Sequence, residues 1–219
     1  LGIGYAEKIA AADKVKHIDA IRREGFPEYT IRPDEPARDE YFSIVYLEPF
    51  WGRNLKAFGY DMYTEPTRRN AMDRARDSGE VALSAMVTLV QEAKQNVQPG
   101  FLAYMPVYRR HLPRATIAER REALQGYVYM PVRARDLLTN ILDSATRDVA
   151  VEIYDGETVA PEKLLYASQQ IDGNGGSLHA TRHINVAGNQ WTIRIASLPS
   201  FDAAFARGQT PTVAAIGVT

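Results

Sequence analysis

The chain has 219 residues, of which 45% are hydrophobic and 24% charged, and its formal net charge is −1. This length is enough for one large domain or two small ones with real hydrophobic cores, and the composition is that of a globular protein. The balanced charge argues against a nucleic-acid-binding protein, which normally carries a basic stripe. The absence of cysteine excludes disulfides, zinc–thiolate sites and a cysteine nucleophile. No run of 18 apolar residues is present, which a membrane-spanning helix requires.

The first predicted element is a long amphipathic helix over residues 5–24. Apolar side chains recur there at steps of three and four residues, with charged ones between them: Ala11, Val15, Ile18 and Ile21. Gly25 and Pro27 end the pattern. Such a helix can bury its stripe on its own domain, or pair with a second copy.

Two short strands and a short helix are predicted next. Residues 29–32 and 42–47 are rich in β-branched and aromatic side chains, and prolines follow both stretches. Residues 53–58 form the short helix, which ends before Gly59.

A better defined helix is predicted over residues 65–78. Thr64 is a good N-cap because its hydroxyl can accept a backbone N–H, and Pro66 suits the first turn. Gly79 suits the position just after the last turn. Apolar residues recur on one side at helical spacing: Ala71, Met72 and Ala75.

The rest of the chain alternates strands with short helices. Thr116 and Glu119 fit a capping box that opens a short helix through Ala123, and residues 135–144 form an amphipathic helix. The predicted strands span residues 81–90, 101–108, 126–132, 149–154, 163–167, 178–186 and 190–196, the last two forming a hairpin. Antiparallel-type strands with inserted helices predict an α+β fold rather than a wound parallel sheet.

The sequence shows no catalytic or metal-binding motif. It contains no Gly-x-Ser-x-Gly elbow, no phosphate-binding loop and no dinucleotide fingerprint. His179 and His183 face the same way on a predicted strand but stand about 13 Å apart, too far to share one metal ion. We therefore expect no catalytic residue, no metal and no cofactor.

A small-molecule pocket is the favoured kind of site, because it needs an apolar lining with a few placed polar groups. Asp61, Ser84 and Thr88 supply the polar groups. The candidate walls come from the same part of the chain: Met62, Leu83, Met86, Phe101, Ala103 and Tyr104. Residues of these types are more often core residues than ligand contacts. An ionised Asp61 only accepts hydrogen bonds, so it favours a ligand with N–H donors. A solvated loop aspartate or a remote helix cap is the other interpretation of Asp61.

Several stretches, in this order along the chain, match the pattern of one family. They are residues 59–75, 82–92 and 98–108, preceded by Gly4-Tyr5-Ala6 and Arg38-Asp39-Glu40-Tyr41. These blocks resemble the CHASE domain, the extracytoplasmic sensor module of bacterial histidine kinases, nucleotide cyclases and plant cytokinin receptors. The similarity covers roughly residues 4–142 and fades after that.

The resemblance implies a stalk helix followed by two stacked PAS-like lobes on the periplasmic side of the membrane. On this basis we expect four parts: a stalk helix (1–25), a membrane-distal ligand-binding lobe (26–122), a membrane-proximal lobe (123–205) and an exit segment toward a membrane helix (206–219). For the last part, an apolar tail docked on the core is the alternative. The resemblance also implies a membrane-anchored receptor, dimeric through its N-terminal helix, with a kinase or cyclase output outside these residues.

The resemblance further implies a ligand. In the plant receptors, an Asp in a Leu-Asp-Met-Met stretch accepts hydrogen bonds from a purine, and Asp61 falls on it. A Thr in their Leu-Thr-Ser-Pro-Phe stretch lines the same pocket, and Ser84 falls on it, although residues 83–87 here lack the Pro-Phe. The implied ligand is a cytokinin-like purine or another amine. A protein-binding or structural dimerisation module without a small ligand is the alternative function.

Overall fold

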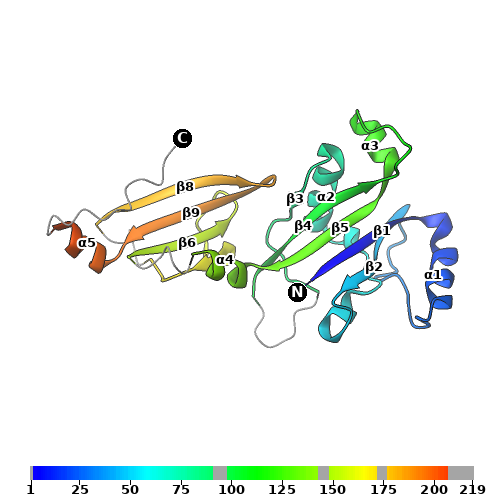
Figure 1. Ribbon diagram of the computed structural model, residues 1–219, viewed down its shortest axis with the longest axis horizontal. Coiled ribbons are helices and arrows are strands. Elements are labelled where there is room, and N and C mark those ends of the chain that lie inside the picture. The colour runs from blue at the N-terminus through cyan, green and yellow to red at the C-terminus, as the bar shows by residue number, and fades with distance from the viewer. Residues whose placement is uncertain (1, 91–97, 143–147, 172–176, 207–219) are drawn as a thin grey trace. The chain divides into compact units, whose positions relative to one another are not determined.

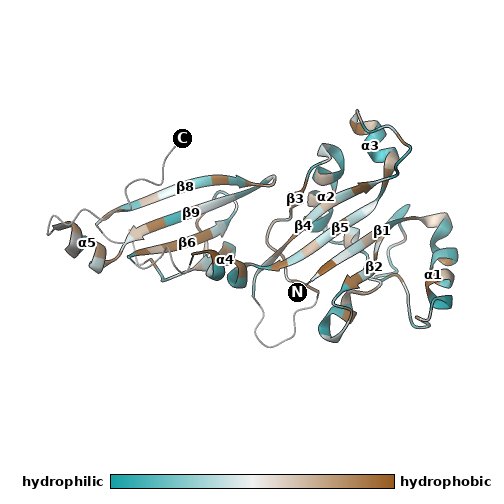
Figure 2. Cartoon of the chain, viewed as in Figure 1, coloured by the Kyte–Doolittle hydropathy of each residue, from teal (hydrophilic) through white to brown (hydrophobic). Residues whose placement is uncertain are grey.

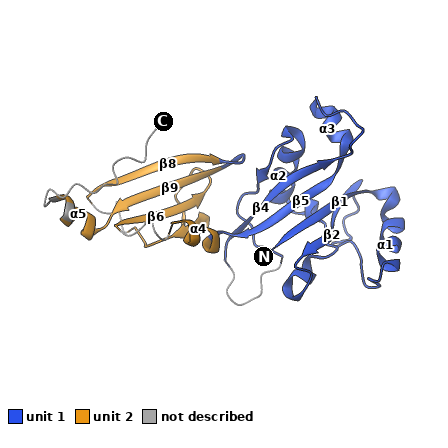
Figure 3. Cartoon of the chain, in the orientation of Figure 1, with its two compact units in different colours: residues 1–134, 186–189 blue, residues 135–185, 190–219 orange. Residues whose placement is uncertain are grey.

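The computed structural model describes residues 2–90, 98–142, 148–171 and 177–206. The chain divides into two compact units, residues 1–134 with 186–189 and residues 135–185 with 190–219 (Figure 3). Each unit contains an antiparallel sheet and helices, so the chain is α+β, as predicted. The sequence predicts that the first lobe ends at residue 122. In the structure, the strand after that residue is the third of the five strands of the first sheet, and the first unit extends to residue 134.

The first unit is built on a five-stranded sheet with the strand order β2-β1-β5-β4-β3 (Figure 1). Its strands are β1 (Ile3–Ala10), β2 (Glu40–Glu48), β3 (Ala82–Leu83), β4 (Gly100–Tyr108) and β5 (Leu124–Arg133). One row of directly opposed, buried residues crosses all five strands: Leu47, Gly4, Tyr129, Tyr104 and Ala82. Directly opposed residues share a face of a sheet, so this row lies on one face.

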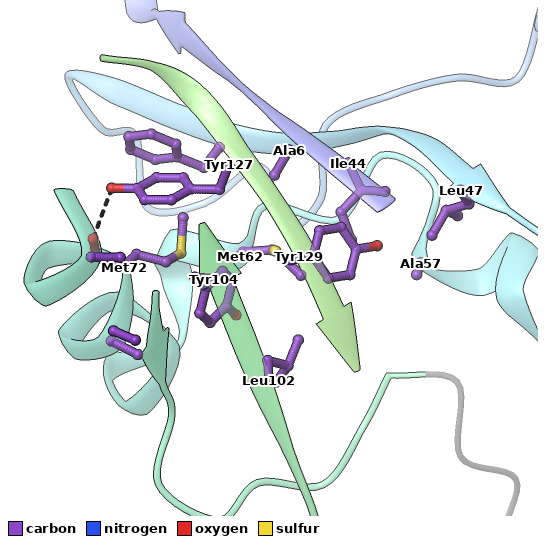
Figure 4. Close-up of a cluster of buried hydrophobic side chains, with 14 of the residues drawn as sticks. Ala6, Ile44, Leu47, Ala57, Met62, Met72, Leu102, Tyr104, Tyr127 and Tyr129 are labelled. Carbon is purple, nitrogen blue, oxygen red and sulfur yellow. Dashed lines mark hydrogen bonds between the residues drawn. The ribbon is translucent and has the colours of Figure 1, made fainter. Parts of the chain in front are cut away.

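Helix α2 covers the face of the sheet that carries this row. The helices of the first unit are α1 (Lys14–Arg23), α2 (Pro66–Ser78) and α3 (Ile117–Ala123), with short 3-10 helices η1 (Ala11–Asp13), η2 (Gly52–Ala57) and η3 (Met62–Thr64). The inner side of α2 and the sheet form one core, which includes Met62, Ala71, Met72, Ala75, Leu102, Tyr104, Tyr127 and Tyr129 (Figure 4). The candidate site must therefore be built inside this core or at its borders.

Helix α2 ends where the sequence predicts, but its N-cap residue differs from the predicted one. Gly79 follows the last turn with a left-handed φ of 80°, as predicted. The N-cap is Glu65 rather than Thr64, because the Glu65 carboxylate accepts the backbone N–H groups of Thr67 and Arg68 at 2.9 Å. Thr64 instead donates its hydroxyl to the Asp61 carbonyl at 2.8 Å.

The predicted long N-terminal helix is wrong for its first residues. Residues 3–10 form β1, and α1 begins only at Lys14. β1 pairs with β2 on one side and β5 on the other, and this two-sided pairing outweighs the local helical spacing. In α1, which is mainly hydrophilic in Figure 2, Ile18 and Ile21 pack on a small core cluster while Val15 is 71% exposed.

Two predicted strands are much shorter than expected. Of residues 81–90, only β3 is a strand, and Val87 adds one isolated bridge to Gly100. Residues 29–32 contribute a single bridge, between Arg32 and Tyr60. The strands predicted at 42–47, 101–108 and 126–132 are confirmed as β2, β4 and β5.

The second unit is a four-stranded sheet with the order β7-β6-β9-β8. Its elements are α4 (Ala134–Leu142), β6 (Val149–Asp155), the 3-10 helix η4 (Pro161–Lys163), β7 (Leu164–Ala167), β8 (His179–Val186), β9 (Asn189–Ser197) and α5 (Pro199–Ala206). The predicted hairpin is confirmed, and its two turn residues, Ala187 and Gly188, both have positive φ. Residues 207–219 of the expected exit segment lie outside the described residues. Within the described part, no helix is both long and apolar enough to cross a membrane.

Candidate ligand-binding site

Asp61 is fully buried and its carboxylate is bonded to the protein. One oxygen, Oδ2, accepts from Nε of Arg38 at 3.0 Å and forms an ion pair with Nη2 of Arg38 at 3.0 Å. The other, Oδ1, accepts the backbone N–H groups of Phe42 at 2.9 Å and Tyr63 at 3.1 Å. These contacts fasten the segment before α2 to β2 and to residue 38. Contact between Asp61 and a ligand stays a prediction.

Ser84 is also buried and bonded to the protein. Its hydroxyl donates to the Ala85 carbonyl at 2.7 Å and accepts the backbone N–H of Leu102 at 2.9 Å. Asp61 forms a bridge with Ser43 on β2, whereas Ser84 continues the edge strand β3 alongside β4. Because β2 and β3 are the two edges of the sheet, the predicted polar pair lies at opposite edges. The structure therefore does not bring Asp61 and Ser84 together.

The predicted wall residues do not form one lining either, because they lie on different faces of the sheet. Met62 and Tyr104 belong to the core under α2, and Leu83 is buried in β3. Phe101 and Ala103 alternate with Tyr104 along β4, so they lie on the other face of the sheet. Met86 is half-buried and Thr88 is exposed.

Two tyrosines in the central row of the sheet bring hydroxyl groups into the core. Tyr104 on β4 and Tyr129 on β5 stand directly opposite each other, 0% and 1% exposed, with ring centroids 6.4 Å apart (Figure 4). Neither hydroxyl has a hydrogen-bond partner in the described part of the chain. Burial raises the pKa of both hydroxyls far above the ordinary value, so both are neutral O–H donors at physiological pH. The ring of Tyr129 lies against Gly4, where a Cβ would be 2.5 Å from its Cε1.

Tyr127 provides an internal reference for these two hydroxyls. It lies two residues before Tyr129 on β5, on the same face, and belongs to the same core. Its hydroxyl donates to the Met72 carbonyl of α2 at 3.0 Å, the dashed line in Figure 4. A buried tyrosine in this core can thus have a protein partner, and Tyr104 and Tyr129 differ in having none among the described residues.

Arg68 is the third member of this group. It is only 3% exposed, and its Nη2 donates to the Thr88 carbonyl at 3.1 Å. Its guanidinium carbon lies 5.2 Å from the ring centre of Tyr60, and its Nε has no hydrogen-bond partner among the described residues. The positive charge of Arg68 partly opposes the rise in the pKa of Tyr104 and of Tyr129. We call Arg68, Tyr104 and Tyr129 the tyrosine–arginine cluster.

Of the three members of this cluster, only Tyr104 is predicted as a site residue from the sequence. The signal for Arg68 was present in α2, since residues 68, 71, 72 and 75 recur at helical spacing and all four are buried. An arginine on the inward stripe of a helix is unusual enough to mark a site. No local sequence pattern distinguishes Tyr129 from Tyr127. Only the register of β4 and β5 shows that Tyr129 lies opposite Tyr104.

The described residues contain no group of three or more acidic or histidine side chains able to hold a metal ion. The cluster supplies hydrogen-bond donors and one positive charge instead. Such a set can hold an acceptor group of a small molecule, within walls that are otherwise apolar.

Comparison with known proteins covers the first unit and part of the second. A sequence model of the CHASE domain matches residues 1–166. A curated relative, "Hybrid signal transduction histidine kinase A" of Dictyostelium discoideum, is 23% identical over 155 residues, which are 68% of this chain. The chain spans 7% of the length of that relative. Because the family match covers well over half of its length, the chain belongs to the CHASE domain family and is a non-catalytic sensor domain of the kind found in histidine kinases.

Proposed function

We propose that this chain binds a small molecule in the core of its first unit and reports the binding to a signalling output in a membrane-bound receptor. The receptor would be of the histidine kinase or diguanylate cyclase type, with the two units as PAS-like lobes on the periplasmic side of the membrane. Family membership and the similarity to a histidine kinase support this proposal. A ligand that prefers one of two arrangements of the domain would shift the population between them.

The observation that carries the proposal is the pair of tyrosine hydroxyls in the core. Removing a hydroxyl from water without giving it a hydrogen bond costs about 1–3 kcal/mol. Tyr104 and Tyr129 both bear this cost in the described structure. Buried polar groups are normally bonded, so two adjacent exceptions on one face suggest a site completed by another molecule.

The test compares the wild-type 219-residue chain with two tyrosine variants, a double variant and a control. A library of small molecules is screened by thermal unfolding, because a ligand that binds the folded state raises Tm. Compounds that bind in the core should lose most of their effect in Tyr104→Phe/Tyr129→Phe and keep it in the control Tyr127→Phe. Compounds that raise Tm equally in all three proteins would place the ligand elsewhere and contradict the proposal.

The prediction of an N–H donor ligand at Asp61, such as a purine or an amine, needs one additional event. Such a ligand has to displace Arg38 from Oδ2 or share that oxygen with it. Calorimetric titration of adenine and amines against wild type and Asp61→Asn checks this. Equal affinities for the two proteins would remove Asp61 from the set of ligand contacts.

Pairing of two copies through the N-terminal helix is part of the same proposal. Among the described residues no side chain of α1 is fully buried, and Val15 is largely exposed, so a surface is available. We expect Val15→Glu to shift a dimer toward monomer in sedimentation experiments. If the variant assembles like the wild type, α1 does not mediate the pairing. A module that only dimerises or binds protein would show this behaviour with no small-molecule ligand.

A further inference from the structure

A pocket of about 370 Å³ opens at the surface of the first unit, the blue part of Figure 3. Its volume falls within the range of about 300–1,000 Å³ that small-molecule sites occupy. The lining consists of residues 25–30 and Arg32 from the loop after α1, and of Leu55 and Phe58 from the segment around η2. No member of the tyrosine–arginine cluster belongs to this lining, so the pocket is separate from the core site proposed above.

Aromatic rings give the pocket an apolar wall. Phe26 and Phe58 line it with ring centroids 5.1 Å apart, and the ring of Phe50 contacts both, at 5.6 and 5.1 Å. The ring of Tyr29 lies 4.9 Å from that of Phe58. Phe26 is 38% exposed and Leu55 is 45% exposed, so apolar surface remains for a ligand to cover.

Arg32 supplies a positive charge whose position is fixed. Its Nη2 donates to the carbonyl oxygens of Phe58 at 2.7 Å and Lys56 at 3.0 Å. Its backbone is fastened as well, because its N–H donates to the Gly59 carbonyl and its own carbonyl accepts from Asp61. The guanidinium is therefore held against the segment that carries Phe58. The two bonds use both hydrogens of Nη2, and the N–H groups of Nε and Nη1 can donate to an anionic group.

Glu28 adds a negative charge to the same lining. Neither Glu28 nor Arg32 is part of an ion pair among the described residues. The pocket therefore presents one charge of each sign beside its aromatic wall. Both side chains are exposed, so water screens each charge, and recognition needs both charges and the apolar wall together.

We propose that this pocket binds a free aromatic α-amino acid, with its carboxylate at Arg32, its ammonium group at Glu28 and its ring against the phenylalanines. An α-amino acid carries one charge of each sign, which matches the two charges of the lining. The guanidinium fork suits the two oxygens of a carboxylate. Aromatic pairs favour edge-to-face contacts, the arrangement that Phe50 already makes with Phe26 and Phe58. This second site does not rest on ligand binding in the core.

The test uses L-phenylalanine and three compounds that each lack one of the recognised groups. 3-Phenylpropionate lacks the ammonium group, phenethylamine lacks the carboxylate, and L-alanine lacks the ring. L-tyrosine and L-tryptophan extend the panel to other rings. Each compound is titrated calorimetrically into the 219-residue chain at pH 7. We expect at least one aromatic amino acid to bind, and the three reduced compounds to bind at least about 10-fold more weakly than it does.

Matched variants then assign each charge of the ligand to its partner. Glu28→Gln should weaken amino-acid binding about 10-fold and remove the preference over 3-phenylpropionate, which has no ammonium group. Arg32→Gln should remove the preference over phenethylamine in the same way. A merely structural role would weaken all compounds alike. The controls Glu24→Gln and Arg53→Gln remove exposed charges outside the lining and should leave binding unchanged.

The double variant Tyr104→Phe/Tyr129→Phe separates this site from the core. Amino-acid binding should be unchanged in it. If the double variant abolishes the binding, the amino acid occupies the core site instead, so the present inference is overturned while the proposed function stands. The inference is also overturned if no aromatic amino acid binds, or if a compound with a single charge binds as tightly as the amino acid.

A second copy of the chain is the rival occupant of the aromatic wall. Sedimentation of Phe26→Ala beside the wild type examines it. We expect the two proteins to show the same assembly state, because the wall serves a small molecule. If Phe26→Ala converts a dimer to a monomer and no amino acid binds, the pocket is an interface between copies and the inference is wrong.

Discussion

Two buried polar regions of the first unit differ in how their groups are satisfied. In the Asp61 region, the carboxylate bonds to Arg38 and to two backbone N–H groups. In the tyrosine–arginine cluster, two hydroxyls and one guanidinium nitrogen have no hydrogen-bond partner among the described residues. A polar group that is fully partnered inside the protein stabilises the fold, whereas one without a partner is a candidate to bind something else. The comparison teaches that burial and chemical type alone do not identify a site.

The largest effect on stability should come from removing Arg38, the ion-pair partner of Asp61. Arg38→Met leaves a fully buried carboxylate with backbone donors only, and we expect a loss of about 3 kcal/mol in the free energy of unfolding. Urea denaturation checks this. The control is Asp34→Ala, which removes an exposed partner of Lys14 and should leave the denaturation midpoint nearly unchanged. A mild effect of Arg38→Met would mean that the Asp61 region does not hold the fold.

The next effect tests the packing of the cluster. Gly4→Ala places a methyl group within 2.6 Å of the Tyr129 hydroxyl, so the ring must move. We expect a loss of about 2 kcal/mol, typical of overpacking in a core. Combining Gly4→Ala with Tyr129→Leu should recover part of this loss, as measured by thermal unfolding. Strictly additive losses in the double variant would argue against the contact between residue 4 and the Tyr129 ring.

The sharpest form of the comparison uses three Tyr→Phe changes in one core. Tyr127→Phe removes a hydrogen bond to Met72 and should lower stability by about 1 kcal/mol. Tyr104→Phe and Tyr129→Phe each remove a buried hydroxyl that lacks a partner, so each should leave ligand-free stability unchanged or raise it by about 1 kcal/mol. Equilibrium denaturation without ligand distinguishes these signs. A loss of about 1 kcal/mol in all three would show that the hydroxyls of residues 104 and 129 do have partners.

The smallest expected effect on stability comes from the ion pairs of Asp77 with Arg121 and Arg76. Hydrogen bonds from Arg121 and then Arg76 hold the pKa of Asp77 well below its ordinary value of 3.8. A depressed folded-state pKa contributes stability that is present above the ordinary value and is lost as the pH falls below it. Asp77→Asn should therefore flatten the decline in denaturation midpoint between about pH 5 and pH 2. An unchanged acid limb in the variant would assign that decline to other carboxylates.

Much of the secondary structure was predictable because its signals are local. The capping box of Thr116 and Glu119 is present in both directions, and the glycine stop after α2 is where the spacing placed it. The strands that became β2, β4 and β5 also carried their own alternation. The helix predicted for the N-terminal residues, up to residue 10, is wrong, because β1 is stabilised by pairing with β2 and β5 and not by its own hydrophobic spacing.

The family, the α+β class and the importance of the stretch around Asp61 and α2 were predictable from the residues alone. Which polar groups in that stretch have partners became clear only once the strands and helices were placed together. Asp61 meets Arg38 from 23 residues away, and Tyr127 meets Met72 from 55 residues away, while Tyr104 and Tyr129 meet only through the strand register. The physical reason is that helix and strand periodicity extends over a few residues, whereas the satisfaction of a buried polar atom depends on whatever the fold brings beside it.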